Sequence, residues 1–187
     1  MVNFEEFREI RFSYHKAEFE RYKWVKEQEK RYNVENISLL NHIIQLYWDS
    51  TRSFMFGNYL ASILCIGSTI EEYLRRIVEL SKHDDIDRIK FYYLIEEAGE
   101  QGLISENLRE KLQYFRDNIR NHVAHPKTLF QFTFLGLEYQ KGDKSWGKEN
   151  GREINPSTAT EDCAKEGILL FLSLVKETIG VKWKNLR

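Results

Sequence analysis

Proline is scarce in this chain of 187 residues, which contains only Pro126 and Pro156. Proline interrupts helices because it lacks a backbone N–H and collides with the preceding turn. Few prolines therefore permit long helices without breaks. Glycine is also infrequent, and none of the glycines forms a phosphate-binding loop of either nucleotide-binding fingerprint.

Long apolar runs are absent: no window holds 18 uncharged apolar residues, and charged residues already occur between Glu5 and Glu9. We therefore expect neither a membrane span nor a secretory signal. The two cysteines, Cys65 and Cys163, lie in apolar helical stretches and are predicted to be buried thiols in a reducing compartment. A cytoplasmic location is expected.

A large excess of basic residues is also lacking, because the formal net charge is −1. This argues against a large surface that binds nucleic acids without sequence preference, since such a surface needs many lysines and arginines on one face. It does not exclude a small local basic site. The apolar fraction of 42% and the length favour one globular, soluble domain over residues 1–187.

What the sequence does contain is helical periodicity. Predicted helices cover about 3–32, 37–55, 58–81, 88–98, 106–125 and 159–179. The stretch 58–81 is the most apolar, with Tyr59, Leu60, Ile63, Ile66, Ile70, Leu74 and Ile77 expected on one face. Gly67 would allow a neighbouring helix to approach closely. The fold class predicted is all-α, an up-and-down helical bundle with an insert around 127–156, either a small β-hairpin or a long ordered loop.

The most informative stretch is Phe115–Pro126, which reads Phe-Arg-Asp-Asn-Ile-Arg-Asn-His-Val-Ala-His-Pro. It places two arginines, two asparagines and two histidines at the end of a helix that Pro126 cannot continue. Arginine binds phosphate through a planar fork of donors, and histidine titrates nearest neutrality. Together they form a candidate site for acting on a phosphodiester without a metal.

Helix geometry leaves simpler interpretations open. Relative to Ile119, Arg116 lies about 60° and Arg120 about 100° round an ideal helix, so both flank the apolar face. Either arginine is also explained by a surface salt bridge. His125 is also explained as a cation at a helix C-terminus, worth roughly 0.3–1 kcal/mol, and His122 as a half-buried boundary residue.

Glu71, on the flank of the apolar helix, is predicted either to orient the arginine or histidine, or to pair with Arg75 four residues on.

Other chemistries have less support. His122 and His125 are three apart, but no carboxylate lies near them in sequence, so no metal is expected. No nucleophile-elbow motif supports a Ser–His–Asp set. A helix-turn-helix over 88–124 would lack a basic start to its second helix.

The segment Arg120-Asn121-His122-Val123-Ala124-His125 resembles the R-N-x-x-x-H signature of HEPN domains (higher eukaryotes and prokaryotes nucleotide-binding). The apolar helix Leu64–Arg75 is similar to the other core helix of that family, an apolar run that ends in an acid and then Leu-Arg. The two segments cover about a quarter of the chain. The insert at 127–156 is not part of the common core of the family.

This resemblance implies an all-α, dimeric bundle in which two signatures form one composite cleft. Active members of the family are metal-independent endoribonucleases that need no cofactor, and many are toxins held by an antitoxin protein or antiviral defence components. The expected catalytic residues are then Arg120 and His125, supported by Asn121, Arg116, His122 and Glu71, and the expected substrate is RNA. Other relatives are inactive dimers that act as protein- or nucleotide-binding modules, which is the alternative expectation.

Overall fold

The computed structural model of the protein describes residues 4–34, 39–78, 90–124 and 156–179, together with four two-residue strands between 133 and 153. In chain order the elements are α1 (Phe4–Tyr32), α2 (Asn41–Met55), α3 (Tyr59–Ile77), α4 (Phe91–Glu100), α5 (Glu106–Tyr114), the π-helical segment η2 (Phe115–Arg120), α6 (Asn121–Ala124), β1 (Thr133–Phe134), β2 (Leu137–Glu138), β3 (Lys148–Glu149), β4 (Arg152–Glu153) and α7 (Pro156–Thr178).

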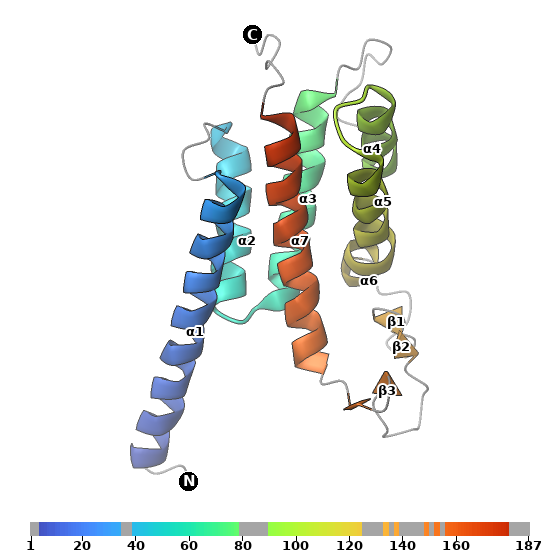
Figure 1. The fold of residues 1–187 in the computed structure, drawn as a ribbon. Helices are drawn as coiled ribbons and strands as arrows, with labels where there is room; N and C mark the ends of the chain where they lie inside the picture. Colours follow the sequence, from blue (N-terminus) through green and yellow to red (C-terminus); the bar gives the residue numbers. More distant parts are fainter. Residues whose placement is uncertain are drawn as a thin grey trace.

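The described helices form a bundle, as predicted from the periodicity. Helices α3 and α7 lie in the middle, with α1 and α2 on one side and α4, α5 and α6 on the other (Figure 1). The N-terminal half of α1 extends past the ends of its neighbours. Among the described helices, none is long and apolar enough to cross a membrane.

Local sequence signals set the ends of the helices. Helix α1 stops at Asn33, which adopts a left-handed backbone with φ of 58°, a conformation that asparagine tolerates better than most residues. Gly57 has φ of 76° in the turn between α2 and α3. Ser105 caps α5, because its hydroxyl accepts a hydrogen bond from the Leu108 N–H at 3.3 Å. The sequence offers Asn33 or Asn36 as the end of the first helix, and the structure ends it at Asn33. The sequence also predicts a break at Gly57 and an N-cap at Ser105, and both are confirmed.

The core centres on α3, as expected for the most apolar helix. Its residues Ile63, Ile66, Ile70 and Leu74 are fully buried. The prediction for Leu60 was wrong, because 51% of this side chain is exposed. Leu60 lies three residues before Ile63, about 60° away at 100° per residue, which places it on the exposed flank of the apolar face.

The insert contains two short antiparallel strand pairs. Strand β1 pairs with β2 through Thr133 and Glu138, and β3 pairs with β4 through Lys148 and Glu153. The residues between β3 and β4 are Asn150 and Gly151, the composition typical of a two-residue hairpin turn. Of the two alternatives predicted for 127–156, the structure therefore describes hairpin pairing. Helix α7 begins at Pro156, three residues before the predicted start, in agreement with the preference of proline for a first helical turn.

Candidate functional site

The helix that carries the Arg120 signature changes its winding within the site. Residues Phe115–Arg120 form a π-helical turn, which ends with the Asn121 N–H donating to the Arg116 carbonyl five residues back. The angles predicted for Arg116 and Arg120 assumed regular α-helical spacing, and the wider turn changes both. Single π turns inside helices occur frequently at functional sites.

The Arg120 side chain lies directly on α3 at Gly67. A Cβ atom added to Gly67 would be 2.7 Å from Arg120 Cγ and 3.7 Å from both its Cβ and Cδ. A real side chain cannot occupy that space unless Arg120 moves. Gly67 therefore allows a close approach, as predicted, and the group that it admits is the stem of the candidate arginine.

Two oxygen acceptors hold the guanidinium of Arg120. Its Nη2 donates to Glu71 Oε2 at 3.4 Å, and its Nη1 donates to Asn121 Oδ1 at 3.1 Å. A guanidinium has five N–H donors, so these two bonds leave capacity for a further acceptor. The side chain remains 23% exposed, which gives solvent access to this edge of α3.

Glu71 belongs to a chain of ion pairs along α3. Its Oε1 accepts a hydrogen bond from Arg75 Nη2 at 3.1 Å, so the carboxylate contacts both Arg75 and Arg120. Both interactions predicted for Glu71 are present at once. Arg75 Nε lies 3.3 Å from Glu72 Oε2, which links Glu71 to the next carboxylate.

Glu72 extends this chain to α2. Arg76 Nε donates to Glu72 Oε1 at 2.8 Å, and the ring Nε2 of His42 lies 3.0 Å from the same oxygen. Burial raises the pKa of Glu72, but the hydrogen bonds and charges of Arg76 and His42 outweigh it, so its pKa is lowered overall. The charged form of this carboxylate is therefore favoured in the folded protein.

Arg116 points to different partners from Arg120. Its Nε donates to Asp117 Oδ1 at 2.8 Å, and its guanidinium carbon lies 4.7 Å from the centroid of the Tyr92 ring on α4. Only 13% of the side chain is exposed, and within the described residues its buried Nη1 has no hydrogen-bond partner. Binding a flanking phosphate would require the Asp117 pair to open.

The two histidines of the signature are placed less completely. His125 lies outside the described residues. The backbone of His122 belongs to α6, which runs from Asn121 to Ala124, but its side chain is not described. The structure therefore brings Arg120, Asn121 and Glu71 together, pairs Arg116 with Asp117 and Tyr92 instead, and gives no position for either imidazole.

The sequence did not lead us to Gly167, the residue of α7 against which the first residue of the π turn packs. A Cβ added to Gly167 on α7 would lie 2.9 Å from the ring of Phe115 and 2.7 Å from Ile66. The fully buried Phe115 ring thus fits against α7 only because residue 167 has no side chain. Glycine inside a strongly apolar helix was the available signal, since it is otherwise unfavourable there.

In the part of the chain that the structure describes, no group of three His, Cys, Asp or Glu side chains is arranged to hold a metal ion. Both cysteines are free thiols, and burial raises the pKa of Cys163 to about 12, so this thiol is not a nucleophile at neutral pH.

Comparison of the chain with protein-family models, curated proteins and solved structures found no match.

Proposed function

We propose that the protein is a metal-independent endoribonuclease of HEPN type, in which Arg120 and His125 act on the phosphodiester. The observation that carries the proposal is the way Arg120 is held. Its stem lies on Gly67, Glu71 and Asn121 accept from its guanidinium, and part of the side chain stays open to solvent. A cation fixed in this way is suited to stabilising negative charge that develops on a phosphate.

The chemistry needs no metal because RNA supplies its own nucleophile. The ribose 2′-OH attacks the adjacent phosphorus and gives up its proton, the bond to the 5′-oxygen breaks, and that oxygen gains a proton. His125 performs the proton transfer, and Arg120 stabilises the crowded phosphate. The products carry a 2′,3′-cyclic phosphate and a 5′-OH. In this proposal Asn121 and Glu71 position Arg120, and His122 and Arg116 are further supporting residues.

Dimerisation would complete this site. Taking Leu60 as zero, Leu64, Gly67 and Glu71 lie within about 40° of it on α3. Arg120 contacts Gly67 and Glu71, whereas Leu60 and Leu64 are 51% and 37% exposed. Apolar side chains left open beside a polar site suit a protein partner. We propose that a second copy of the chain covers them and brings a second Arg120 to the cleft, and that an antitoxin protein is a further possible partner.

The test is cleavage of single-stranded RNA by the purified protein in EDTA. Metal-free cleavage that leaves 2′,3′-cyclic phosphate ends, and that spares DNA, is expected. Arg120→Ala and His125→Ala should each abolish it, and Glu71→Gln should reduce it. Arg52→Ala is the matched control, since Arg52 is exposed on α2 and lies outside the site. Unchanged cleavage by the Arg120→Ala, His125→Ala double variant would disprove the mechanism.

A second candidate function is a HEPN-like dimer without catalysis, which acts as a protein- or nucleotide-binding module. The observation that favours it is that both terminal nitrogens of Arg120 already donate to protein acceptors. Intact RNA in EDTA, together with a dimer in sedimentation that Leu60→Glu and Leu64→Glu dissociate, would support the module. A monomer at all accessible concentrations would contradict both proposals.

A further inference from the structure

The outward face of α1 carries lysines and aromatic rings in a single stripe. Taking Phe12 as zero, Lys16, Phe19, Lys23, Lys26 and Lys30 all lie within about 40° of it at 100° per residue. The acidic residues of this part of α1 lie further round the helix: Glu27 at about 60°, Glu20 at about 80°, and Glu18 and Glu29 beyond these. We call the positively charged face from Phe12 to Lys30 the α1 stripe.

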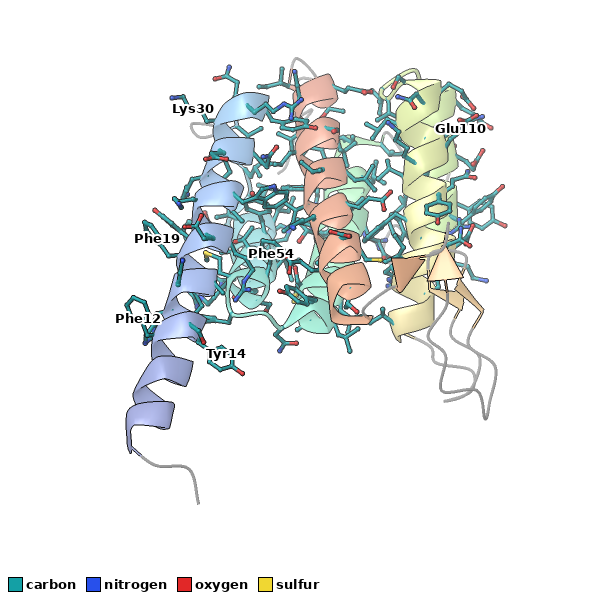
Figure 2. All side chains as sticks on the ribbon, turned by 60° about the horizontal axis from the view of Figure 1, so that its bottom comes forward. Phe12, Tyr14, Phe19, Lys30, Phe54 and Glu110 are labelled. Carbon is teal, nitrogen blue, oxygen red and sulfur yellow. The ribbon has the colours of Figure 1, made fainter. Side chains whose placement is uncertain are left out.

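The α1 stripe is open to solvent along its length. Phe12 is 74% and Phe19 is 58% exposed, and Lys16, Lys23, Lys26 and Lys30 are exposed between and beyond them. Figure 2 shows Phe12, Phe19 and Lys30 on the outer side of α1 and Tyr14 on the opposite side. A rise of 1.5 Å per residue gives the α1 stripe a length of about 27 Å.

The rings of the α1 stripe already have charged and aromatic neighbours. Lys23 Nζ lies 5.1 Å from the centroid of the Phe19 ring, and Phe19 is stacked with Tyr22 at 6.5 Å and 21° between planes. A flat aromatic surface beside ammonium groups presents a stacking face and a positive charge together. This combination matches the two parts of a nucleotide, a base and a phosphate.

Two lysines of the α1 stripe form local ion pairs. Lys23 pairs with Glu20 and Lys26 with Glu29, both at 2.7 Å and three residues apart. Lys23 and Glu20 are both about half exposed, and an exposed pair of this kind contributes little to stability, so opening it for phosphate contacts costs little. Glu29 is only 12% exposed and also accepts a hydrogen bond from the Tyr47 hydroxyl, so Lys26 is held more firmly than Lys23.

The opposite face of α1 is fixed to the bundle. Val25 is buried, the Trp24 ring lies 5.3 Å from that of Phe54, and Arg21 Nε donates to the Met55 carbonyl at 2.8 Å. Arg21 Nη1 also donates to the Tyr59 hydroxyl of α3 at 3.3 Å, and that hydroxyl in turn donates to Glu161 on α7 at 2.7 Å. These contacts give α1 a fixed rotation, so the α1 stripe cannot turn inward.

We propose that the α1 stripe binds single-stranded nucleic acid, with bases stacked on Phe12 and Phe19 and phosphates held by the flanking lysines. Charge complementarity requires a polyanion, and the exposed rings require one with accessible flat groups. A duplex hides its bases from the rings. A membrane-bound helix separates its apolar face from its cationic face, whereas here the two kinds of side chain share one stripe.

Binding by the α1 stripe does not require the proposed cleavage at Arg120, and the two are tested separately. The probe is fluorescein-labelled oligothymidylate of about 15 nucleotides, which lacks the 2′-OH and cannot be cleaved by the mechanism proposed above. Fluorescence anisotropy is measured on the whole chain over a range of salt concentrations. If the protein binds the oligonucleotide but does not cleave RNA, only the proposed ribonuclease activity is overturned. If it cleaves RNA but does not bind the oligonucleotide, only the proposed binding by the α1 stripe is overturned.

Two matched pairs of variants decide the result. The double variant Phe12→Ala, Phe19→Ala should weaken binding at least about tenfold, whereas Tyr14→Ala, which is 63% exposed on the opposite side, should leave it unchanged. The double variant Lys16→Gln, Lys30→Gln should make the slope of log K against log salt shallower by about 1.4. The double variant Lys90→Gln, Lys111→Gln, which alters exposed lysines elsewhere, should not change that slope.

Competing occupants are part of the same experiment. Poly-glutamate and vesicles of phosphatidylcholine with phosphatidylserine are each added to the preformed complex, and neither should displace the oligonucleotide at equal charge. A duplex of the same length should bind at least tenfold more weakly. Equal binding of poly-glutamate, vesicles or duplex would overturn the proposal, as would unchanged affinity in the Phe12→Ala, Phe19→Ala variant.

Discussion

The site around Arg120 and the α1 stripe both present cations, yet they do so by opposite means. Arg120 lies on a glycine and is bonded to Glu71 and Asn121, so the guanidinium has a defined position. The lysines of the α1 stripe are exposed, and the ion pairs of Lys23 with Glu20 and of Lys26 with Glu29 are local to the helix. Fixed cations suit chemistry on one bond, whereas mobile cations spread over about 27 Å suit a flexible chain.

Substituting one phenylalanine in each region gives the largest contrast. Phe115→Ala removes a fully buried ring beneath the π turn and should lower the free energy of unfolding by about 3–5 kcal/mol. Phe12→Ala removes an exposed ring and should change it by no more than about 0.5 kcal/mol. Urea denaturation followed by circular dichroism measures both. A similar loss in the two variants would mean that the N-terminal half of α1 is covered in solution.

The next largest effect is that of Gly67→Ala on the free energy of unfolding, and its sign should depend on whether Arg120 is present. Gly67→Ala forces a methyl group against Arg120 Cγ, and overpacking of about 1–3 kcal/mol should outweigh the helix propensity gained. In the Arg120→Ala background the obstructing atom is gone. There Gly67→Ala should stabilise the protein by about 0.5–1 kcal/mol.

This double-mutant cycle is measured by urea denaturation of the four proteins. It isolates the contact between Gly67 and Arg120 from general effects of alanine in α3. The same cost for Gly67→Ala in both backgrounds would show that Arg120 does not lie on Gly67 in solution.

The smallest effects are those of two carboxylates whose pKa values shift in opposite directions. Glu72 has a lowered pKa, so its stabilisation is present above its unfolded value of about 4.3 and is lost as the pH falls through the folded value. Burial raises the pKa of Glu166, which the charge of Lys111 only partly opposes, so ionised Glu166 destabilises the fold at neutral pH.

At pH 7, Glu72→Gln should therefore destabilise the protein by less than about 1 kcal/mol, and Glu166→Gln should stabilise it slightly. Both differences should disappear in acid, where each carboxyl is protonated with or without folding. Thermal unfolding at a series of pH values from neutral to acidic measures this. Changes of the same sign at pH 7 would contradict the environment described for one of the two residues.

Much of the fold follows from local sequence. Helical periodicity located the helices that the structure describes, and the ends at Asn33, Gly57 and Ser105 follow from backbone and capping chemistry that acts within a few residues. The run from Phe115 to Pro126 likewise marked Arg120 and Asn121, because their spacing is visible in the chain itself. Leu60 was misplaced, because periodicity gives the faces of a helix but not how far its neighbours extend.

Tertiary packing decided the rest. The Phe115 ring at the start of the π turn fits against Gly167 of α7, and the direction of Arg120 depends on Gly67 and Glu71, which lie about fifty residues earlier in the chain. The α1 stripe became evident only once Val25 and Trp24 fixed which side of α1 faces the bundle. Propensity and capping act between near neighbours in sequence, whereas the exposure and bonding of a side chain depend on atoms that folding brings from distant segments.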